Sequence, residues 1–138
     1  MVIDSALLQD IVEHAREEYD AECCGMVAYA AGEDGEGELR ARRVHRAVNI
    51  FASRKRFEID GKELLRTLNE FEGDGLELGA IYHSHTHTAP YPSQTDINFA
   101  ASWPGLEWVI VGLADDEPDV RCYMIDGGEV REVALEVR

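Results

Sequence analysis

The chain has 138 residues, of which 45% are hydrophobic and 30% are charged, as in ordinary soluble globular proteins. This length suits a single domain with a core large enough to fold without disulfides or oligomerisation. The 28 acidic residues outnumber the 13 basic ones and give a formal net charge of −15. That charge disfavours nucleic acid as a partner and favours basic partners, although a generally acidic, salt-adapted proteome explains the same excess.

The lack of targeting segments and the use of cysteine both bear on the cellular compartment of the protein. No apolar run approaches the roughly 20 residues that cross a bilayer, and the N-terminal residues lack a secretory signal, so we expect a cytoplasmic protein. Cys23, Cys24 and Cys122 form neither a disulfide framework nor a C-x-x-C pair. We expect these cysteines to be small buried residues on strands.

The first half of the chain predicts two helices and two strands. Apolar residues at helical spacing predict the first helix, with Asp4 or Ser5 as its cap. Asp60 and Glu63 have the spacing of a capping box for the second helix, and glycines end it. The expected elements are a helix over 4–18, a strand over 23–30, an acidic loop over 32–38, a strand over 39–48 and a helix from 60 to 73.

The second half predicts one more helix and four more strands. An apolar strand over 76–82 runs directly into His83, and Ser93 begins a helix that Pro104 stops. The apolar segment 108–113 predicts a central strand, and Asp126-Gly127-Gly128 predicts a hairpin between strands 120–125 and 130–137. This order of elements predicts an α/β fold with a mixed sheet flanked by helices, in one domain over residues 1–138.

A cluster of polar residues follows the strand that ends near residue 82. Side chains alternate along a strand, so His83 and His85 point to the same side, and the rigid loop after them can return Asp96 to the same place. Two histidines and a carboxylate with an open fourth position are typical of a catalytic zinc site. Solvated or core histidines are the alternative, and Ser93 and Asp96 also fit a capping box, a role that a ligating Asp96 can fill only in part.

The same residues carry a family resemblance. His83-Ser84-His85, seven residues, Ser93, two residues and Asp96 resemble the full signature of the JAMM (MPN+) metalloproteases, whose domain has a cytidine deaminase-like fold. The competing register, which starts at His85 and His87, puts a threonine where the signature has serine. Upstream, Glu22 resembles the distal glutamate of the family, at the start of the first core strand.

The likeness is greatest to the small bacterial JAMM peptidases that act on sulfur-carrier proteins. Thr86 follows the second histidine, where eukaryotic deubiquitinases of this class usually have proline, and residues 91–96 also resemble the sulfur-carrier branch. Asn49, Phe57 and Asp60 fit the middle segment of the family. His87 departs from the pattern, and we expect it to be solvated rather than part of a cleft.

The resemblance implies roles for the matched residues. His83, His85 and Asp96 would hold one Zn²⁺ per chain, Glu22 would be the general base, and Ser93 would donate a hydrogen bond to the oxyanion. Ser84, on the opposite strand face, is expected to pack rather than to act as a nucleophile.

The resemblance also implies a substrate, namely a small ubiquitin-like or sulfur-carrier protein with a C-terminal Gly-Gly tail. The expected reaction releases cysteine from a carrier–cysteine adduct, and the tail is expected to lie extended beside residues 51–57. The alternatives are an isopeptidase that removes ubiquitin-like modifiers from lysine, a peptidase of small peptides, and a non-catalytic scaffold of the same fold. A zinc deaminase is excluded, because the chain lacks His-x-Glu and Pro-Cys-x-x-Cys.

Overall fold

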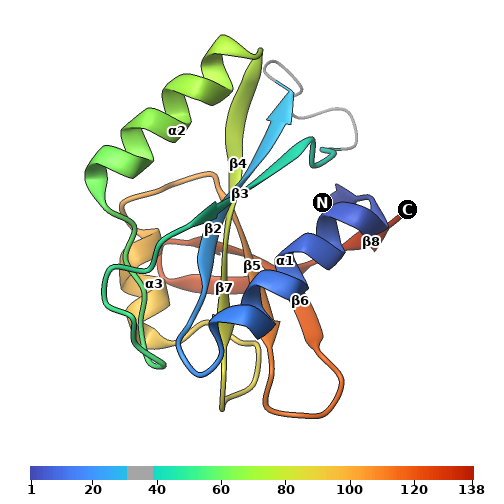
Figure 1. Ribbon diagram of the computed structural model, residues 1–138, viewed down its shortest axis with the longest axis vertical. Helices are drawn as coiled ribbons and strands as arrows, with labels where there is room; N and C mark the ends of the chain where they lie inside the picture. Colours follow the sequence, from blue (N-terminus) through green and yellow to red (C-terminus); the bar gives the residue numbers. More distant parts are fainter. Residues whose placement is uncertain (31–38) are drawn as a thin grey trace.

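Eight strands and three helices make up residues 1–30 and 39–138, the part of the chain that the computed structural model describes (Figure 1). In chain order they are β1 (Val2–Ile3), α1 (Ser5–Glu18), β2 (Cys24–Ala30), β3 (Arg43–Ala47), α2 (Gly61–Gly73), β4 (Leu76–His85), α3 (Gln94–Ala100), β5 (Glu107–Gly112), β6 (Asp119–Asp126), β7 (Glu129–Val133) and β8 (Glu136–Val137). The acidic loop expected over 32–38 lies outside the described residues.

The main sheet is mixed, as the sequence predicts. Its strand order is β3-β2-β4-β5-β6-β7, in which β4 and β5 run parallel and the other neighbours run antiparallel. β1 and β8 form a second, parallel pair. Helix α3 connects β4 to β5, and this connection is what allows two consecutive strands of the sheet to run in the same direction. The α/β fold class is therefore confirmed.

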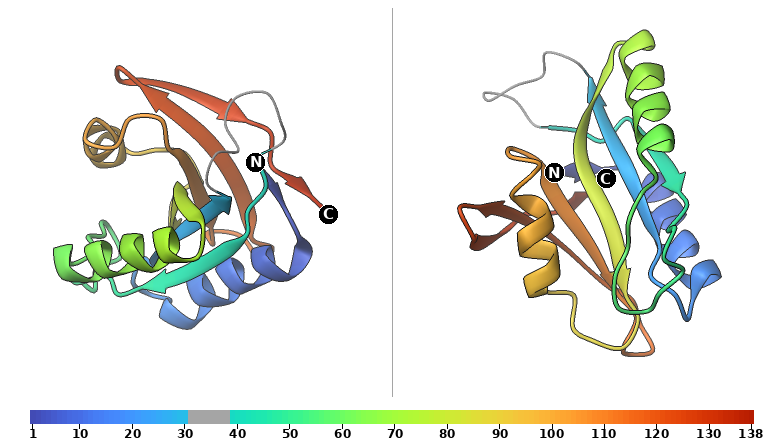
Figure 2. Two further views of the ribbon diagram at one scale, coloured as in Figure 1. Left: turned by 90° about the horizontal axis from the view of Figure 1, so that it is seen from above. Right: turned by 90° about the vertical axis from the view of Figure 1, so that its left-hand side faces the viewer.

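Alternating residues of the strands build two apolar layers, one on each face of the sheet. Ile11 and Ala15 of α1 pack with Ala80 and Tyr82 on one face. Phe71 of α2 and Ala100 of α3 belong to the cluster on the other face, with Ile81 and Trp108. Figure 2 shows α1 and α3 on opposite sides of the sheet. The parity of each β4 side chain thus decides whether it faces α1 or α3.

Most of the expected elements form, and so do the predicted cap of α1 and the predicted hairpin turn. The side chain of Asp4 accepts a hydrogen bond from the Leu7 N–H at 2.8 Å and caps α1, as predicted. Gly127 and Gly128 adopt φ angles of 58° and 83°, which a two-residue hairpin turn requires. The three cysteines are free and buried, also as expected. Within the described residues, no helix is long and apolar enough to cross a membrane.

Four expectations were wrong, three of them because a tertiary contact competes with a local signal. The strand expected over 39–48 is paired in the main sheet only over Arg43–Ala47. The third helix ends at Ala100, before Pro104. The last strand divides, because β8 leaves the main sheet to pair with β1.

The capping box expected at α2 is the fourth of these. The side chain of Asp60 accepts from the Lys62 N–H at 3.1 Å, as an N-cap does. Glu63, however, turns to His45 of β3, with 2.9 Å between Oε2 and Nε2, and also accepts from the Val48 N–H at 3.1 Å. Glu63 therefore joins α2 to the edge strand.

Candidate metal centre

Two histidines share one face at the carboxyl end of β4. His83 and His85 lie on the side of Ile81, toward α2 and α3, and both are buried. Ser84 points the other way and accepts a hydrogen bond from the Cys23 N–H at 2.8 Å. The expected separation of the strand faces is confirmed, and Ser84 has the packing role expected for it.

Asp96 reaches the histidines from the first turn of α3. Its Oδ2 atom lies 3.1 Å from Nε2 of His83 and 3.1 Å from Nε2 of His85. The same oxygen accepts a hydrogen bond from the Ser93 N–H at 2.9 Å, while Ser93 Oγ accepts from the Asp96 N–H at 3.1 Å. The capping box is thus complete even though the same oxygen faces both histidines, whereas we expected a ligating Asp96 to fill the capping role only in part.

The three polar atoms form a nearly equilateral triangle. The third edge, between Nε2 of His83 and Nε2 of His85, is 3.2 Å. Ligands at about 2.0–2.1 Å from a tetrahedral zinc ion lie about 3.3–3.4 Å apart, so the observed edges are close to that spacing. Two imidazoles and one carboxylate are also the donor set of catalytic zinc sites. The residues therefore fit a divalent metal ion in both spacing and chemistry.

Glu22 joins this cluster from the segment just before β2. Because β2 pairs antiparallel with β4 and Cys24 lies opposite His83, Glu22 has the parity that faces the two histidines. Its Oε1 atom lies 3.9 Å from Nε2 of His85, and its Oε2 atom has no hydrogen-bond partner among the described residues. Burial raises the pKa of Glu22 to about 7, with Asp96 adding to the rise and His85 opposing it.

Two sets of metal ligands can be drawn from these residues. Glu22, His83 and His85 each offer a ligand atom within 4.8 Å of the others, and Asp96 with the same histidines forms the triangle of 3.1–3.2 Å. Since zinc–ligand distances are close to 2 Å, the tighter triangle matches a shared ion better. Glu22 then stands at the edge of the site, 3.9 Å from Nε2 of His85.

Contacts outside the cluster fix the orientation of His85. Its Nδ1–H donates to the Ala89 carbonyl at 2.8 Å, which leaves the Nε2 lone pair for the cluster. The loop that holds this carbonyl is fixed next to it, because the Tyr123 hydroxyl donates to the Pro90 carbonyl at 2.5 Å. Gly112 of β5 packs directly against the Pro90 ring. The sequence carries no signal for Tyr123 or Gly112 in this role.

Outside the cluster, His83 is held by packing rather than by a hydrogen bond. Its ring stacks on Phe57 with 4.6 Å between centroids, and its Nδ1 atom has no partner among the described residues. Burial lowers the pKa of His83, which favours the neutral imidazole that binds metals. Burial alone would raise the pKa of Asp96, but the hydrogen bonds of His83 and His85 outweigh it and hold that pKa well below its usual range. Neutral imidazole and ionised carboxylate are the forms that act as ligands.

The loop between β3 and α2 supports Glu22 through its backbone. The Glu22 N–H donates to the Ser53 carbonyl at 2.7 Å, and the Asn49 amide donates to the Glu22 carbonyl at 3.0 Å. Residues 51–57 of this loop are not a strand, so the extended edge expected there does not form. The edge of the sheet on this side is β3 instead.

His87 is solvated, as expected, and it also contacts the segment before β2. It is exposed, but its Nε2 lies 2.6 Å from Oδ1 of Asp20, and its ring is 5.7 Å from that of Tyr19. The pair joins the loop after β4 to the segment that leads to Glu22. Nothing in the sequence connects Asp20 to His87, because they meet only when β2 pairs with β4.

The chain is similar to named peptidases along almost its whole length. A profile of prokaryotic homologs of the JAB domain matches residues 4–126. The CysO-cysteine peptidase of Mycobacterium tuberculosis is 33% identical over 138 residues, which cover 99% of this chain and 90% of the relative. The desampylase of Haloferax volcanii is 34% identical over 137 residues, which cover 92% and 88%.

Solved structures agree with the fold. The solution structure of protein DSY2949 from Desulfitobacterium hafniense has a TM-score of 0.86 at 24% identity and covers 99% of this chain and 92% of that one. The crystal structure of AF2198, a JAB1/MPN domain protein from Archaeoglobus fulgidus, has a TM-score of 0.65 at 20% identity, with 99% and 98% covered.

Proposed function

Because the chain belongs to the prokaryotic JAB-domain family of JAMM (MPN+) proteins, we propose that it is a zinc-dependent peptidase of ubiquitin-like or sulfur-carrier conjugates. Residues 1–138 would form one catalytic domain. Within this class, the reaction we favour is release of cysteine from the C-terminal glycine tail of a carrier protein. A relative that covers 99% of this chain is named a CysO-cysteine peptidase, and the desampylase makes cleavage of a modifier from a lysine side chain the second candidate.

One observation carries the proposal: three ligand atoms within 3.2 Å of one another, with a carboxylate at their edge. A structural zinc site is usually closed by four protein ligands, whereas catalytic sites keep one position open. His83, His85 and Asp96 would supply three ligands. Glu22, at 3.9 Å from His85 Nε2, is too far out to complete the same set and is better suited to proton transfer.

The chemistry follows from these positions. A zinc ion bound here supplies a Lewis acid that polarises the scissile carbonyl and brings the pKa of water to about 7. Glu22 accepts the proton of the attacking water at a carboxylate oxygen and passes it to the leaving nitrogen. Oε2 of Glu22 has no other partner among the described residues and is available for that proton.

Ser93 would stabilise the oxyanion. Its Oγ already accepts the Asp96 N–H, and its own hydroxyl hydrogen is not required by the capping box. The side chain is exposed, so it can donate to an oxygen of the substrate. An oxyanion donor of this kind contributes roughly 3–4 kcal/mol to the transition state.

Next to Glu22 there is room for a substrate tail. A pocket of about 260 Å³ is lined by residues from the end of α1, the segment before β2, the last residue of β3 and the loop after it, namely Glu18, Ala21, Glu22, Cys23, Ala47, Val48, Asn49 and Ala52. A Gly-Gly tail has no side chains and fits a narrow pocket of this kind. The edge strand β3 ends at the same pocket and offers backbone groups for an extended peptide.

The test combines metal content with cleavage. We expect the parent protein and Glu22→Ala to contain one zinc ion per chain when purified without chelators, and only the parent to release cysteine from a carrier–cysteine adduct. Asp96→Ala is expected to lose both zinc and activity. If all three proteins lack stoichiometric zinc and cleave nothing, the chain is a scaffold of the same fold and the proposal is wrong.

A further inference from the structure

A second hollow lies near the site, apart from the pocket beside Glu22. It has a volume of about 320 Å³ and is lined by Arg54, Lys55, His87 and Thr88. Both walls adjoin the site. His87 follows His85 by two residues, which span at most about 7 Å. On the other wall, Arg54 follows Ser53, whose carbonyl accepts the Glu22 N–H. We call these four residues the cationic groove.

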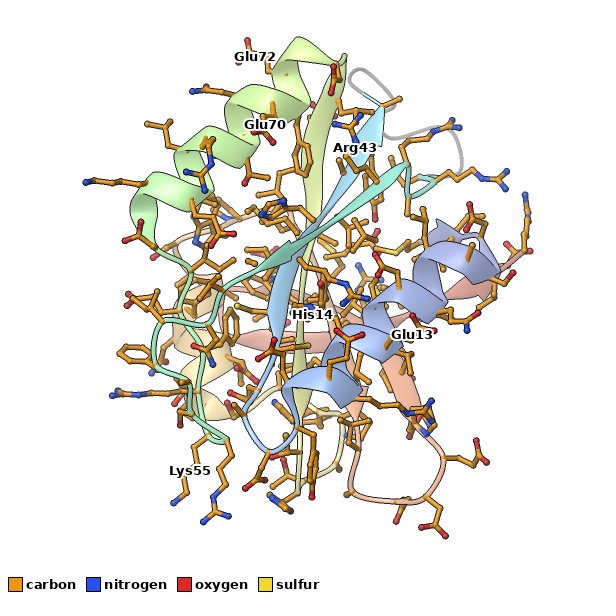
Figure 3. The ribbon with its side chains drawn as sticks, in the orientation of Figure 1. Glu13, His14, Arg43, Lys55, Glu70 and Glu72 are labelled. Atoms are coloured by element: carbon orange, nitrogen blue, oxygen red, sulfur yellow. The ribbon has the colours of Figure 1, made fainter. Side chains whose placement is uncertain are left out.

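The charge of this groove opposes that of the molecule as a whole. The chain carries a net charge of −15, yet the segment Arg54-Lys55-Arg56 places three consecutive basic residues beside the site. Lys55 extends into solvent from the loop between β3 and α2 (Figure 3), and its ammonium has no ion-pair partner in residues 1–30 and 39–138. A cation that is left unpaired beside a site in a strongly acidic protein is available to an anionic ligand.

One acidic residue, Asp20, also lies at the groove. Its carboxylate is already shared between His87, at 2.6 Å, and Nη1 of Arg54, at 3.6 Å. Asp20 thus joins the two walls, and most of its charge is compensated by them. With Lys55 added, the groove keeps a net positive charge, which the burial of a carboxylate between its walls would neutralise.

We propose that the cationic groove binds the α-carboxylate of the amino acid that leaves from the carrier tail. This inference rests on the proposed function and narrows its substrate. The glycine tail carries no charge, so the carboxylate of the leaving residue is the anion nearest the scissile bond. Its carbon lies two bonds from the scissile nitrogen, about 2.5 Å away, and therefore next to the site. Arg54 and Lys55 are long enough to reach it from the groove wall.

The groove would also discriminate between the two candidate substrates, an adduct with a free amino acid and a conjugate to a lysine side chain. In a conjugate to a lysine side chain, the leaving amine is followed by an aliphatic chain and carries no carboxylate at this position. Such a substrate has no carboxylate at this position for Arg54 and Lys55 to bind. The groove therefore favours adducts with a free amino acid over isopeptides to lysine.

The test compares two dye-labelled peptides that end in Gly-Gly-Cys, one as the free acid and one as the carboxamide. Their affinity for zinc-loaded Glu22→Gln is measured by fluorescence anisotropy, and their kcat/KM by cleavage with the parent protein. Each charge in an exposed groove is expected to contribute up to about fivefold, so the acid should be preferred by about five- to twentyfold. In Arg54→Gln/Lys55→Gln the preference should fall to near one. Lys62→Gln/Arg66→Gln, which removes two positive charges outside the groove, should retain the preference.

The outcomes separate this inference from the proposed function. The inference is overturned if Glu22→Gln with an intact groove binds the acid and the carboxamide equally well. It is also overturned if the preference for the acid survives Arg54→Gln/Lys55→Gln. A preference that disappears when zinc is removed, but survives in Arg54→Gln/Lys55→Gln, assigns the carboxylate to the metal and also overturns it. If the parent cleaves neither peptide, the proposed function is wrong for these tails, while the anisotropy ratio still decides whether the groove binds the carboxylate.

Discussion

Substitution of Gly112 by alanine is expected to weaken zinc binding without any contact to the metal site itself. A Cβ at this position would lie 2.8 Å from Cδ of Pro90 and 3.0 Å from its Cβ and Cγ. Carbon atoms prefer separations of about 3.5–4.0 Å, so the proline ring has to move by roughly 0.5–1 Å. The neighbouring Ala89 carbonyl moves with it, and the 2.8 Å hydrogen bond from Nδ1 of His85 is lost or bent.

Loss of such an outer contact typically lowers metal affinity by about 10- to 100-fold, or about 1.4–2.8 kcal/mol. The overpacked β5 is also expected to cost about 1–3 kcal/mol of stability. Zinc affinity is measured by competition with a chromophoric chelator, at a temperature where circular dichroism shows that the variant is folded. Gly73→Ala is the matched control, because a Cβ there meets nothing within 4 Å.

A second substitution tests the same loop by removing a different contact. Tyr123→Phe removes the hydroxyl that donates to the Pro90 carbonyl and creates no steric conflict. Its effect on zinc affinity should have the same sign as that of Gly112→Ala and be smaller. If folded Gly112→Ala binds zinc within twofold of the parent, the orientation of His85 does not depend on this loop and the reasoning is refuted.

Three further predictions concern catalysis and stability. Ser93→Ala should lower kcat by about 100- to 1000-fold, whereas loss of its cap alone should cost only about 1 kcal/mol in urea unfolding. Asn49→Ala should lower the cleavage rate and leave zinc content unchanged, since its amide holds the backbone carbonyl of Glu22 at 3.0 Å; loss of zinc would contradict this. Burial lowers the pKa of His14, which contacts the Tyr82 hydroxyl at 2.7 Å, below its ordinary value of 6.5. Below pH 6.5 the unfolded chain therefore binds a proton that the folded chain does not, and stability falls; His14→Asn should show a flatter decline of urea midpoints between pH 7.5 and 5.5.

Much of the candidate site follows from short-range patterns. The spacing of His83 and His85 fixes their common strand face, and Ser93 and Asp96 fix the start of α3. These signals are local, because the alternation of a strand and the cap of a helix depend on a few neighbouring residues. The hairpin turn at Gly127 and Gly128 is of the same kind.

Other features depend on which strands meet. A family resemblance points to Glu22, but its position 3.9 Å from His85 results from the antiparallel pairing of β2 with β4. The same pairing brings Asp20 to His87, and His87 then lines one wall of the cationic groove. Periodicity within a segment carries no information about such partners.

The sequence by itself therefore determined most of the elements, the shared face of the two histidines and the residues that we propose as metal ligands. Only the tertiary structure decided that one oxygen of Asp96 both caps α3 and faces the histidines, and that Glu63 leaves its capping box for His45. The physical reason is the range of the interactions. Strand parity and helix caps are decided within a few residues, whereas contacts between distant segments form only when the sheet brings them together.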